Sequence, residues 1–235
     1  MQHLQSTARQ LQKKYELFKK KNIEDALRKI IEHVSGKNLG LRSDLECAGQ
    51  FASKKFENKF RQDKKTPLFL HSIFLLEILH QFGENETATF IAALLHDTIE
   101  DTKTTEREIS KLKFASTNKR VLDLVKKLTQ DKSVSDALPK GGVISFRVKK
   151  FIKQLTGAPK EVINIELADR IHDFLDVGYL KVLEPERARQ RLANKIERNE
   201  TIVATITRRR GDINKSLLSF FKFLKSEVKK ELKRF

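Results

Sequence analysis

Apolar residues recur at intervals of three and four along most of the chain, and this spacing predicts a succession of amphipathic helices. The pattern predicts a first helix over residues 7–33. Residues typical of helix caps and helix ends then predict a helix from Ser43 to Phe60 and another from Pro67 to Phe82. The remaining predicted helices cover residues 86–101, 105–113, 118–130, 143–156, 160–177 and 185–210, with a last helix that runs from beyond Gly211 to residue 235.

The stretch from Phe90 to Asp101 departs most clearly from this amphipathic pattern. Its first half is apolar on every side and therefore predicts a buried helix, while its second half carries an imidazole and three carboxylates, His96, Asp97, Glu100 and Asp101. On a continuous helix their spacings of three and four make these side chains neighbours. Crowded carboxylates repel one another and lose hydration, and a bound cation relieves both problems. The plainer alternative is a solvated acidic helix end.

Composition supports an all-α chain. The 235 residues are 39% hydrophobic and 34% charged, with only 9 Gly and 4 Pro to punctuate turns. We expect one helical domain over residues 1–235, with a core at about 45–180 and basic helical extensions at 1–44 and 181–235. A single cysteine, Cys47, excludes an intrachain disulfide. No apolar run approaches the roughly 18 residues that span a bilayer, so we expect a cytoplasmic protein without a membrane span.

The net charge of +17 is concentrated at the two ends of the chain. Residues 1–30 carry 8 Lys and Arg against 3 Asp and Glu, and residues 181–235 carry 16 against 7. Basic ends can attract nucleic acid, an anionic membrane or a polyanionic substrate. The alternative is a solvated surface on terminal helices, and because no nucleic-acid-binding motif is present we do not favour nucleic acid. No oligomeric state follows from the sequence.

Four residues on three predicted helices make a candidate metal-ligand set: His71, His96, Asp97 and Asp169. Two imidazoles and two carboxylates suit Mn²⁺, Fe or Zn²⁺, and do not suit a metal that seeks thiolates. His71 lies among apolar residues, where a histidine can also be an ordinary hydrogen-bonded core residue.

This pattern resembles the HD-domain metal phosphohydrolases, and within them the hydrolase domain of RelA/SpoT proteins. The matching motifs are Ala92-Ala-Leu-Leu-His-Asp-Thr-Ile-Glu-Asp-Thr102, then Thr105 with Glu108-Ile109, and Leu167-Ala-Asp-Arg-Ile-His172. Ala48, Phe51, Ala52 and Arg61 match the segment before the first metal histidine, so the resemblance covers about residues 45–180.

The resemblance implies a multi-helix HD-domain bundle that removes the 3′-diphosphate of ppGpp and pppGpp, giving GDP or GTP and pyrophosphate. By motif, His71, His96, Asp97 and Asp169 would bind one Mn²⁺ per chain, and Glu100 and Asp101 would serve the attacking water. Arg61 would contact the nucleotide, Lys64 and Lys65 would steer it, and Asp173 falls in the nucleotide-contacting part. Because the synthetase domain of long members has no room here, the chain resembles a small stand-alone alarmone hydrolase.

The chain departs from the family pattern at several positions. Phe56 replaces a histidine, Asn58-Lys59 replaces Gly-Gln, Glu166 replaces a lysine and Asp173 replaces an asparagine. An acid beside a phosphate is unfavourable, so the substrate could instead be another 3′-phosphorylated nucleotide or cofactor. A third hypothesis is a helical nucleic-acid-binding protein with a vestigial HD site.

Overall fold

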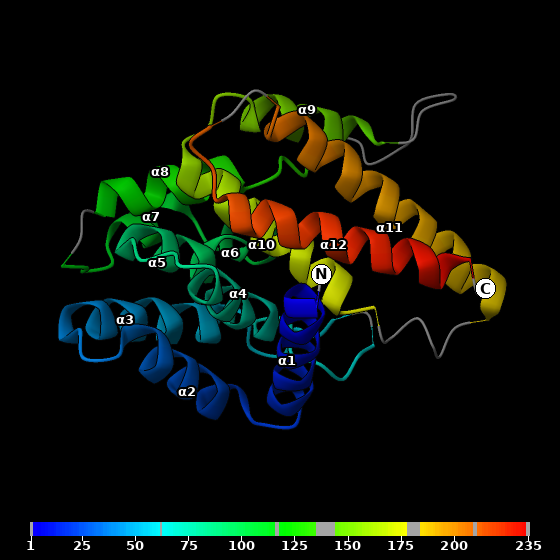
Figure 1. Ribbon diagram of the computed structural model, residues 1–235. Coiled ribbons are helices and arrows are strands. Elements are labelled where there is room, and N and C mark those ends of the chain that lie inside the picture. The colour runs from blue at the N-terminus through cyan, green and yellow to red at the C-terminus, as the bar shows by residue number, and fades with distance from the viewer. Residues whose placement is uncertain are drawn as a thin grey trace. The chain divides into compact units, whose positions relative to one another are not determined.

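A computed structural model describes residues 2–61, 63–115, 118–134, 144–177, 184–208 and 211–233 of the chain. These residues form twelve α-helices, labelled α1 to α12 in Figure 1. Among them the extended pairing is limited to one isolated antiparallel bridge between Phe60 and Pro67. The all-α prediction is therefore confirmed.

The helices pack into two compact units, which we call the central unit (Lys13–Thr129) and the terminal unit (Met1–Gln12 with Gln130–Phe235). Helix α1, Gln2–Lys19, runs across the boundary. The central unit also contains α2 (Ile23–Ser35), α3 (Leu39–Lys55), α4 (Leu70–Gln81), α5 (Thr87–Leu95), α6 (Thr98–Asp101), α7 (Glu106–Ser110) and α8 (Asn118–Leu128). A single domain over residues 1–235 stays a prediction.

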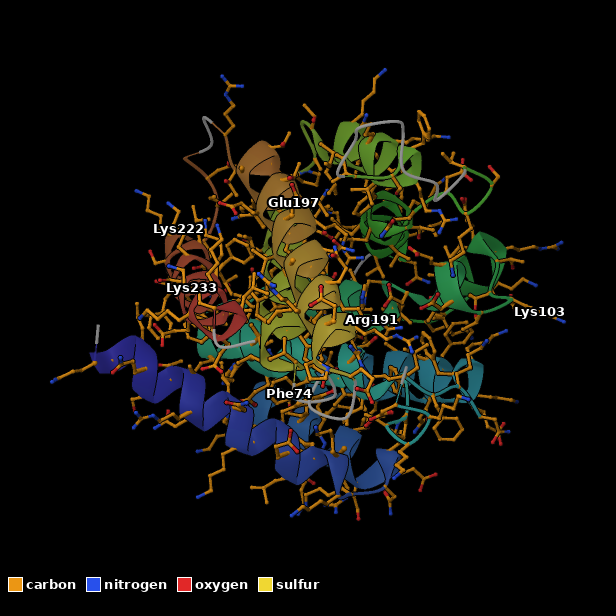
Figure 2. All side chains as sticks on the ribbon, turned by 90° about the vertical axis from the view of Figure 1, so that its right-hand side faces the viewer. Phe74, Lys103, Arg191, Glu197, Lys222 and Lys233 are labelled. Atoms are coloured by element: carbon orange, nitrogen blue, oxygen red, sulfur yellow. The ribbon has the colours of Figure 1, made fainter. Side chains whose placement is uncertain are left out.

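Helices α4 and α5 form the apolar centre of the central unit. Helix α3 packs against α2 and α5, α4 packs against α2 and α5, and α8 covers α5 from another side (Figure 1). Phe74 of α4, labelled in Figure 2, is fully buried, and its ring lies 4.9 Å from that of Tyr15. Because neighbours surround α4 and α5, each is apolar on nearly every side, as the sequence predicts for Phe90 to Leu95.

The terminal unit consists mainly of four helices: α9 (Phe146–Leu155), α10 (Lys160–Leu175), α11 (Pro185–Ile206) and α12 (Lys215–Leu232). Helix α12 packs on both α10 and α11, and Phe221 stacks on Phe174 of α10 at 5.3 Å between ring centroids. The apolar face of α12 is therefore covered, while lysines such as Lys222 and Lys233 stand at its surface (Figure 2).

Two helix boundaries differ from the prediction because asparagine caps were overlooked. Residues 7–33 form two helices: α1 ends at Lys19, and α2 starts after Asn22, whose side chain accepts a hydrogen bond from the Asp25 amide at 2.7 Å. Likewise the N-cap of α3 is Asn38, five residues ahead of the predicted cap Ser43. Asparagine at an N-cap satisfies an amide that the first turn leaves without a partner.

The helix predicted to start at Pro67 begins at Leu70, because residues 66–68 pair with residues 59–61 in a turn that precedes it. In the described part of the chain, none of the helices has the length and apolar character needed to cross a bilayer.

Candidate functional site

Three of the predicted metal ligands come together in the central unit. His71 lies in the first turn of α4, His96 follows the last residue of α5, and Asp97 precedes α6. One ligand atom from each lies within 4.8 Å of the others, and the two imidazole rings are 5.2 Å apart between centroids. Both histidines are buried and Asp97 is partly exposed. The imidazoles are therefore shielded from water, while the Asp97 carboxylate is accessible to it.

The orientation of the His96 ring is set by the backbone. Its Nδ1 donates to the carbonyl oxygen of Ala93 at 2.9 Å, and because a carbonyl can only accept, the proton of the neutral ring resides on Nδ1. The other ring nitrogen, Nε2, lies 2.9 Å from Oδ2 of Asp97 and is the atom available to a metal. Nε2 of His71 lies 3.9 Å from the same oxygen. A histidine that binds a metal through one nitrogen usually donates the N–H of the other to a carbonyl or carboxylate, as Nδ1 of His96 does.

The continuous helix predicted over residues 86–101 is wrong. Helix α5 ends at Leu95, a turn occupies His96 and Asp97, and the four-residue α6 follows. The side chain of Thr98 donates to the Leu95 carbonyl at 2.6 Å, which closes the turn at the end of α5. This break puts both ligand residues at a helix terminus, where their side chains can reach the same point as His71.

The predicted acid pair lies on α6. Glu100 and Asp101 are both partly exposed, and the Asp101 amide donates to the carbonyl of Asp97 at 2.8 Å. One helical turn therefore still separates Asp101 from Asp97, although the longer helix is interrupted. Whether these two acids act on a water is not decided by their position and stays a prediction.

Thr105 and Glu108, which contribute to the resemblance, have a local structural role. They form a capping box at the start of α7, and Lys55 of α3 donates to Glu108 at 2.6 Å. The hydrogen bond from Lys55, together with those from Thr105, lowers the pKa of Glu108 to about 2. These residues tie α7 to α3 and thereby support the turn that follows α6.

The predicted substrate-binding residues Arg61, Lys64 and Lys65 lie in the tight turn before α4. The Arg61 amide donates to the Thr66 carbonyl and the Leu68 amide to the Lys59 carbonyl, each at 2.8 Å. Lys64 and Lys65 are exposed at the tip, and Arg61 is partly buried.

Sequence reasoning overlooked Asp63, which organises this turn. Its carboxylate accepts hydrogen bonds from the Lys65 amide at 2.9 Å and from the amide and hydroxyl of Thr66 at 2.8 and 2.6 Å. Burial alone would raise the pKa of Asp63, but these hydrogen bonds and the nearby charge of Arg61 lower it. An aspartate that bonds to amides two and three residues ahead is a local turn signal that the sequence carries.

Asp169 and Asp173 lie one turn apart on α10 in the terminal unit. Asp169 pairs with the guanidinium of Arg170. Asp173 is buried and accepts hydrogen bonds from Lys195, Arg198 and Asn199 of α11. Burial would raise the pKa of Asp173, but the charges of Lys195, Arg198 and Arg170 lower it well below its usual range. In this structure Asp173 joins α10 to α11, and its contact with a nucleotide stays a prediction.

The departures near the first histidine also have local explanations. Phe56 is buried and stacks on Phe69 with ring centroids 5.7 Å apart, so it pins the end of α3 to the residue before α4. Asn58 replaces a glycine and has a φ of +59°, in the left-handed region. Asparagine is among the few non-glycine residues that tolerate that region, so the turn keeps its shape.

These features define a helical protein with a candidate centre made of two imidazoles and a carboxylate, a ligand set that suits a borderline or hard divalent metal. The HD-domain family model matches residues 48–211, which is more than half of the chain. The chain belongs to the HD-domain family. The match extends beyond the predicted core at 45–180 and includes all of α11.

The chain is similar in sequence to several proteins with assigned names. Guanosine-3′,5′-bis(diphosphate) 3′-pyrophosphohydrolase MESH1 of Xenopus tropicalis is 35% identical over 144 residues, which are 59% of this chain and 70% of the relative. Its human counterpart is 34% identical over 133 residues, 56% of this chain and 68% of the relative. The GTP pyrophosphokinase rsh of Brucella melitensis is 33% identical over 126 residues, 52% of this chain but only 16% of that longer protein.

A solved structure has the same fold. It is described as a metazoan ortholog of SpoT that hydrolyzes ppGpp and plays a role in starvation responses. It superposes with a TM-score of 0.60 at 24% identity, covering 78% of this chain and 94% of the other. The HD-domain bundle predicted from the sequence motifs is therefore confirmed at the level of fold.

Proposed function

We propose that this protein is a metal-dependent hydrolase that removes the 3′-diphosphate of ppGpp and pppGpp. The observation that carries the proposal is the convergence of His71, His96 and Asp97 in an HD-domain chain whose relatives bear that activity in their names. The products are GDP or GTP and pyrophosphate.

The donor set fits a divalent metal ion. His96 presents Nε2 because its Nδ1 is held by the Ala93 carbonyl, and Asp97 supplies a carboxylate oxygen next to it. We propose Mn²⁺, since mixed nitrogen and oxygen ligands without a thiolate suit it, although Fe and Zn²⁺ have similar preferences. Asp169 would be the fourth ligand, and its assignment rests on the family motif. When bound, the ion would neutralise phosphate charge and lower the pKa of a bound water.

The carboxylates of α6 would handle the proton. Water adds to the phosphorus next to the 3′ oxygen, and the bond between that oxygen and phosphorus breaks. Glu100 or Asp101 accepts the proton that the water loses and returns a proton to the 3′ oxygen, which leaves as a hydroxyl. Both side chains are only partly buried, so they can exchange protons with solvent between turnovers.

The basic turn before α4 would guide the substrate. Lys64 and Lys65 stand exposed at its tip, and the hydrogen bonds to Asp63 hold the turn in one shape. A strongly anionic nucleotide is attracted to such a group, and the effect weakens as salt is raised. Arg61 is the residue of this turn that we assign to nucleotide contact.

The acid at Asp173 does not argue against ppGpp and pppGpp as the substrates. An acid is unfavourable next to phosphate when its charge is uncompensated. Here the carboxylate lies within 3.4 Å of cationic groups on Arg170, Lys195 and Arg198. The charge that motivated a different 3′-phosphorylated substrate is therefore neutralised within the terminal unit.

A substrate panel tests the proposal. Purified protein with Mn²⁺ should hydrolyse ppGpp and pppGpp and release pyrophosphate, which phosphorus NMR identifies directly. NADPH, other 3′-phosphorylated nucleotides and nucleoside monophosphates complete the panel. Turnover of NADPH with none of ppGpp would assign the site to the other substrate class. Failure with every nucleotide, combined with salt-sensitive binding to nucleic acid, would support a vestigial HD site.

A further inference from the structure

Arg170 is a buried arginine in contact with three acids of its own helix. Its Nε lies 2.9 Å from Glu166, its Nη1 lies 3.4 Å from Asp173, and its Nη2 contacts Asp169. Only 6% of Arg170 is exposed. A guanidinium is planar, and its N–H donors keep fixed positions relative to one another. When Glu166 and Asp173 hold two of the Arg170 nitrogens, the position of the third nitrogen, which contacts Asp169, is also fixed.

A second group of residues, on α11, holds Asp173. Lys195 donates to both Oδ1 and the backbone carbonyl of Asp173, at 3.0 and 3.1 Å. Arg198 and Asn199 donate to Oδ2 at 3.1 and 3.3 Å. The side-chain oxygen of Asn199 in turn accepts from Arg170 at 3.4 Å. A continuous hydrogen-bonded chain therefore runs from α11 through Asp173 and Arg170 to Asp169.

This network joins acidic side chains to basic ones. The acids are Glu166, Asp169 and Asp173, and the bases are Arg170, Lys195 and Arg198. Glu166 and Asp173 are two of the positions at which the sequence departs from its family, and both contact the same guanidinium. The two departures are thus parts of one arrangement, because both supply negative charge around Arg170.

We propose that Arg170 is a positioning residue for Asp169, and that Asp173 with its α11 partners fixes Arg170 for this task. The inference rests on the proposed function, in which Asp169 is a metal ligand. A carboxylate restrained by an anchored guanidinium has less conformational freedom to lose when it binds an ion. Partners that orient a metal ligand typically account for about 10- to 100-fold in metal affinity.

The test is a titration of the metal-free protein with Mn²⁺, in which the EPR signal of free Mn²⁺ reports binding without any substrate. Arg170→Lys keeps the charge but removes the fork, and its affinity for Mn²⁺ should fall about 10- to 100-fold. Arg189→Lys makes the same exchange at an exposed position of α11 and serves as the matched control. Its affinity should equal that of the wild type.

Asp173→Asn provides a second variant in case Arg170→Lys does not fold. It preserves size but removes the charge that links Arg170 to the basic residues of α11, so the loss of Mn²⁺ affinity should be about tenfold, the lower end of the same range. Thermal unfolding of each metal-free variant establishes that it is folded before the titration. A larger loss in Asp173→Asn than in folded Arg170→Lys would overturn the inference, because Asp173 would then act on the metal more directly than Arg170.

Asp169→Asn separates this inference from the proposed function. If Asp169→Asn loses Mn²⁺ affinity while folded Arg170→Lys and Asp173→Asn bind as tightly as the wild type, only the positioning role fails. If Asp169→Asn itself binds Mn²⁺ like the wild type, the proposed ligand set is wrong and the positioning role fails with it. Graded losses in the order Asp169→Asn, Arg170→Lys, Asp173→Asn would establish the inference.

Discussion

Two clusters of buried ionisable side chains, one in each unit, differ in how their polar atoms are matched. In the central unit, the imidazoles of His71 and His96 and the carboxylate of Asp97 bring potential ligand atoms within 4.8 Å of one another. In the terminal unit, each carboxylate oxygen of Asp173 has cationic donors at hydrogen-bonding distance. The first cluster brings together nitrogen and oxygen atoms that can bind a metal. The second cluster pairs hydrogen-bond donors with hydrogen-bond acceptors.

The contrast separates a candidate metal centre from an ion-pair network whose proposed task is to position Asp169. A cluster of nitrogen and carboxylate oxygen atoms is stable only when a cation binds among them or when they share protons. Matched ion pairs satisfy one another without a ligand, and removal of one member leaves the others buried without compensation. Substitutions in the first cluster should therefore affect metal binding and activity, and substitutions around Asp173 should affect stability as well.

The largest effect is expected from removal of a histidine ligand. His96→Ala should lose bound Mn²⁺ and with it nearly all hydrolysis, because Nε2 of His96 is held toward Asp97 by the backbone. Metal content measured by elemental analysis and the rate of pyrophosphate release give the two readouts. If His96→Ala retains full metal content, His96 is not a metal ligand. The two clusters would then no longer differ in metal binding as proposed.

The next largest effect concerns the proton-transfer acids. Glu100→Gln keeps the size of the side chain but cannot accept a proton, so turnover should fall roughly 10²- to 10⁴-fold. Metal content should stay that of the wild type, since Glu100 lies on α6 beyond the ligand turn. Release of the metal from Glu100→Gln would instead make Glu100 a ligand, and wild-type turnover would refute its catalytic role.

Asp173 provides the matching test of the terminal unit. Asp173→Ala removes an acid that both Lys195 and Arg170 contact in a largely buried setting, and should lower the free energy of unfolding by about 3–5 kcal/mol. Urea denaturation of the metal-free protein measures this loss. As a control, Glu200→Ala removes an acid from the partly exposed pairs with Lys225 and Lys229, and should cost no more than about 1 kcal/mol. Equal losses for both variants would contradict the structural reading of Asp173.

The same carboxylate predicts the acid sensitivity of the fold. Because the folded-state pKa of Asp173 is lowered, its contribution to stability is complete above the unfolded-state pKa, near 3.8. The contribution is lost as the pH falls from that value toward the lower folded-state pKa. The stability difference between wild type and Asp173→Ala should therefore shrink when unfolding is measured below about pH 4.

The smallest effect is expected at the basic C-terminal helix. Lys229 and Lys230 form exposed pairs with Glu200 and Glu227, and Lys233 is exposed near the end of α12. Charge reversal at all three should change the salt dependence of activity but leave turnover at moderate salt within about threefold. A collapse of turnover in a folded variant would mean that α12 contributes to the active site.

The family motifs were readable because they are short and local. The sequence predicted the three grouped ligands from the family motifs and the buried character of α5 from its apolar run. It did not predict the end of α5 at Leu95. The spacing of residues 96–101 in the sequence is the same whether the helix continues or is interrupted by a turn. In the structure a turn interrupts it, closed by the hydrogen bond from Thr98 to the Leu95 carbonyl.

The all-α class, the HD motifs and the candidate ligands were determined by the sequence alone, because helix periodicity and motif spacing are properties of neighbouring residues. Only the tertiary structure decided the environment of the departures. Phe56 gains its stacking partner 13 residues later, and Asp173 meets Lys195 and Arg198 only because α10 packs against α11. Such pairings depend on how helices pack, and no local spacing encodes them.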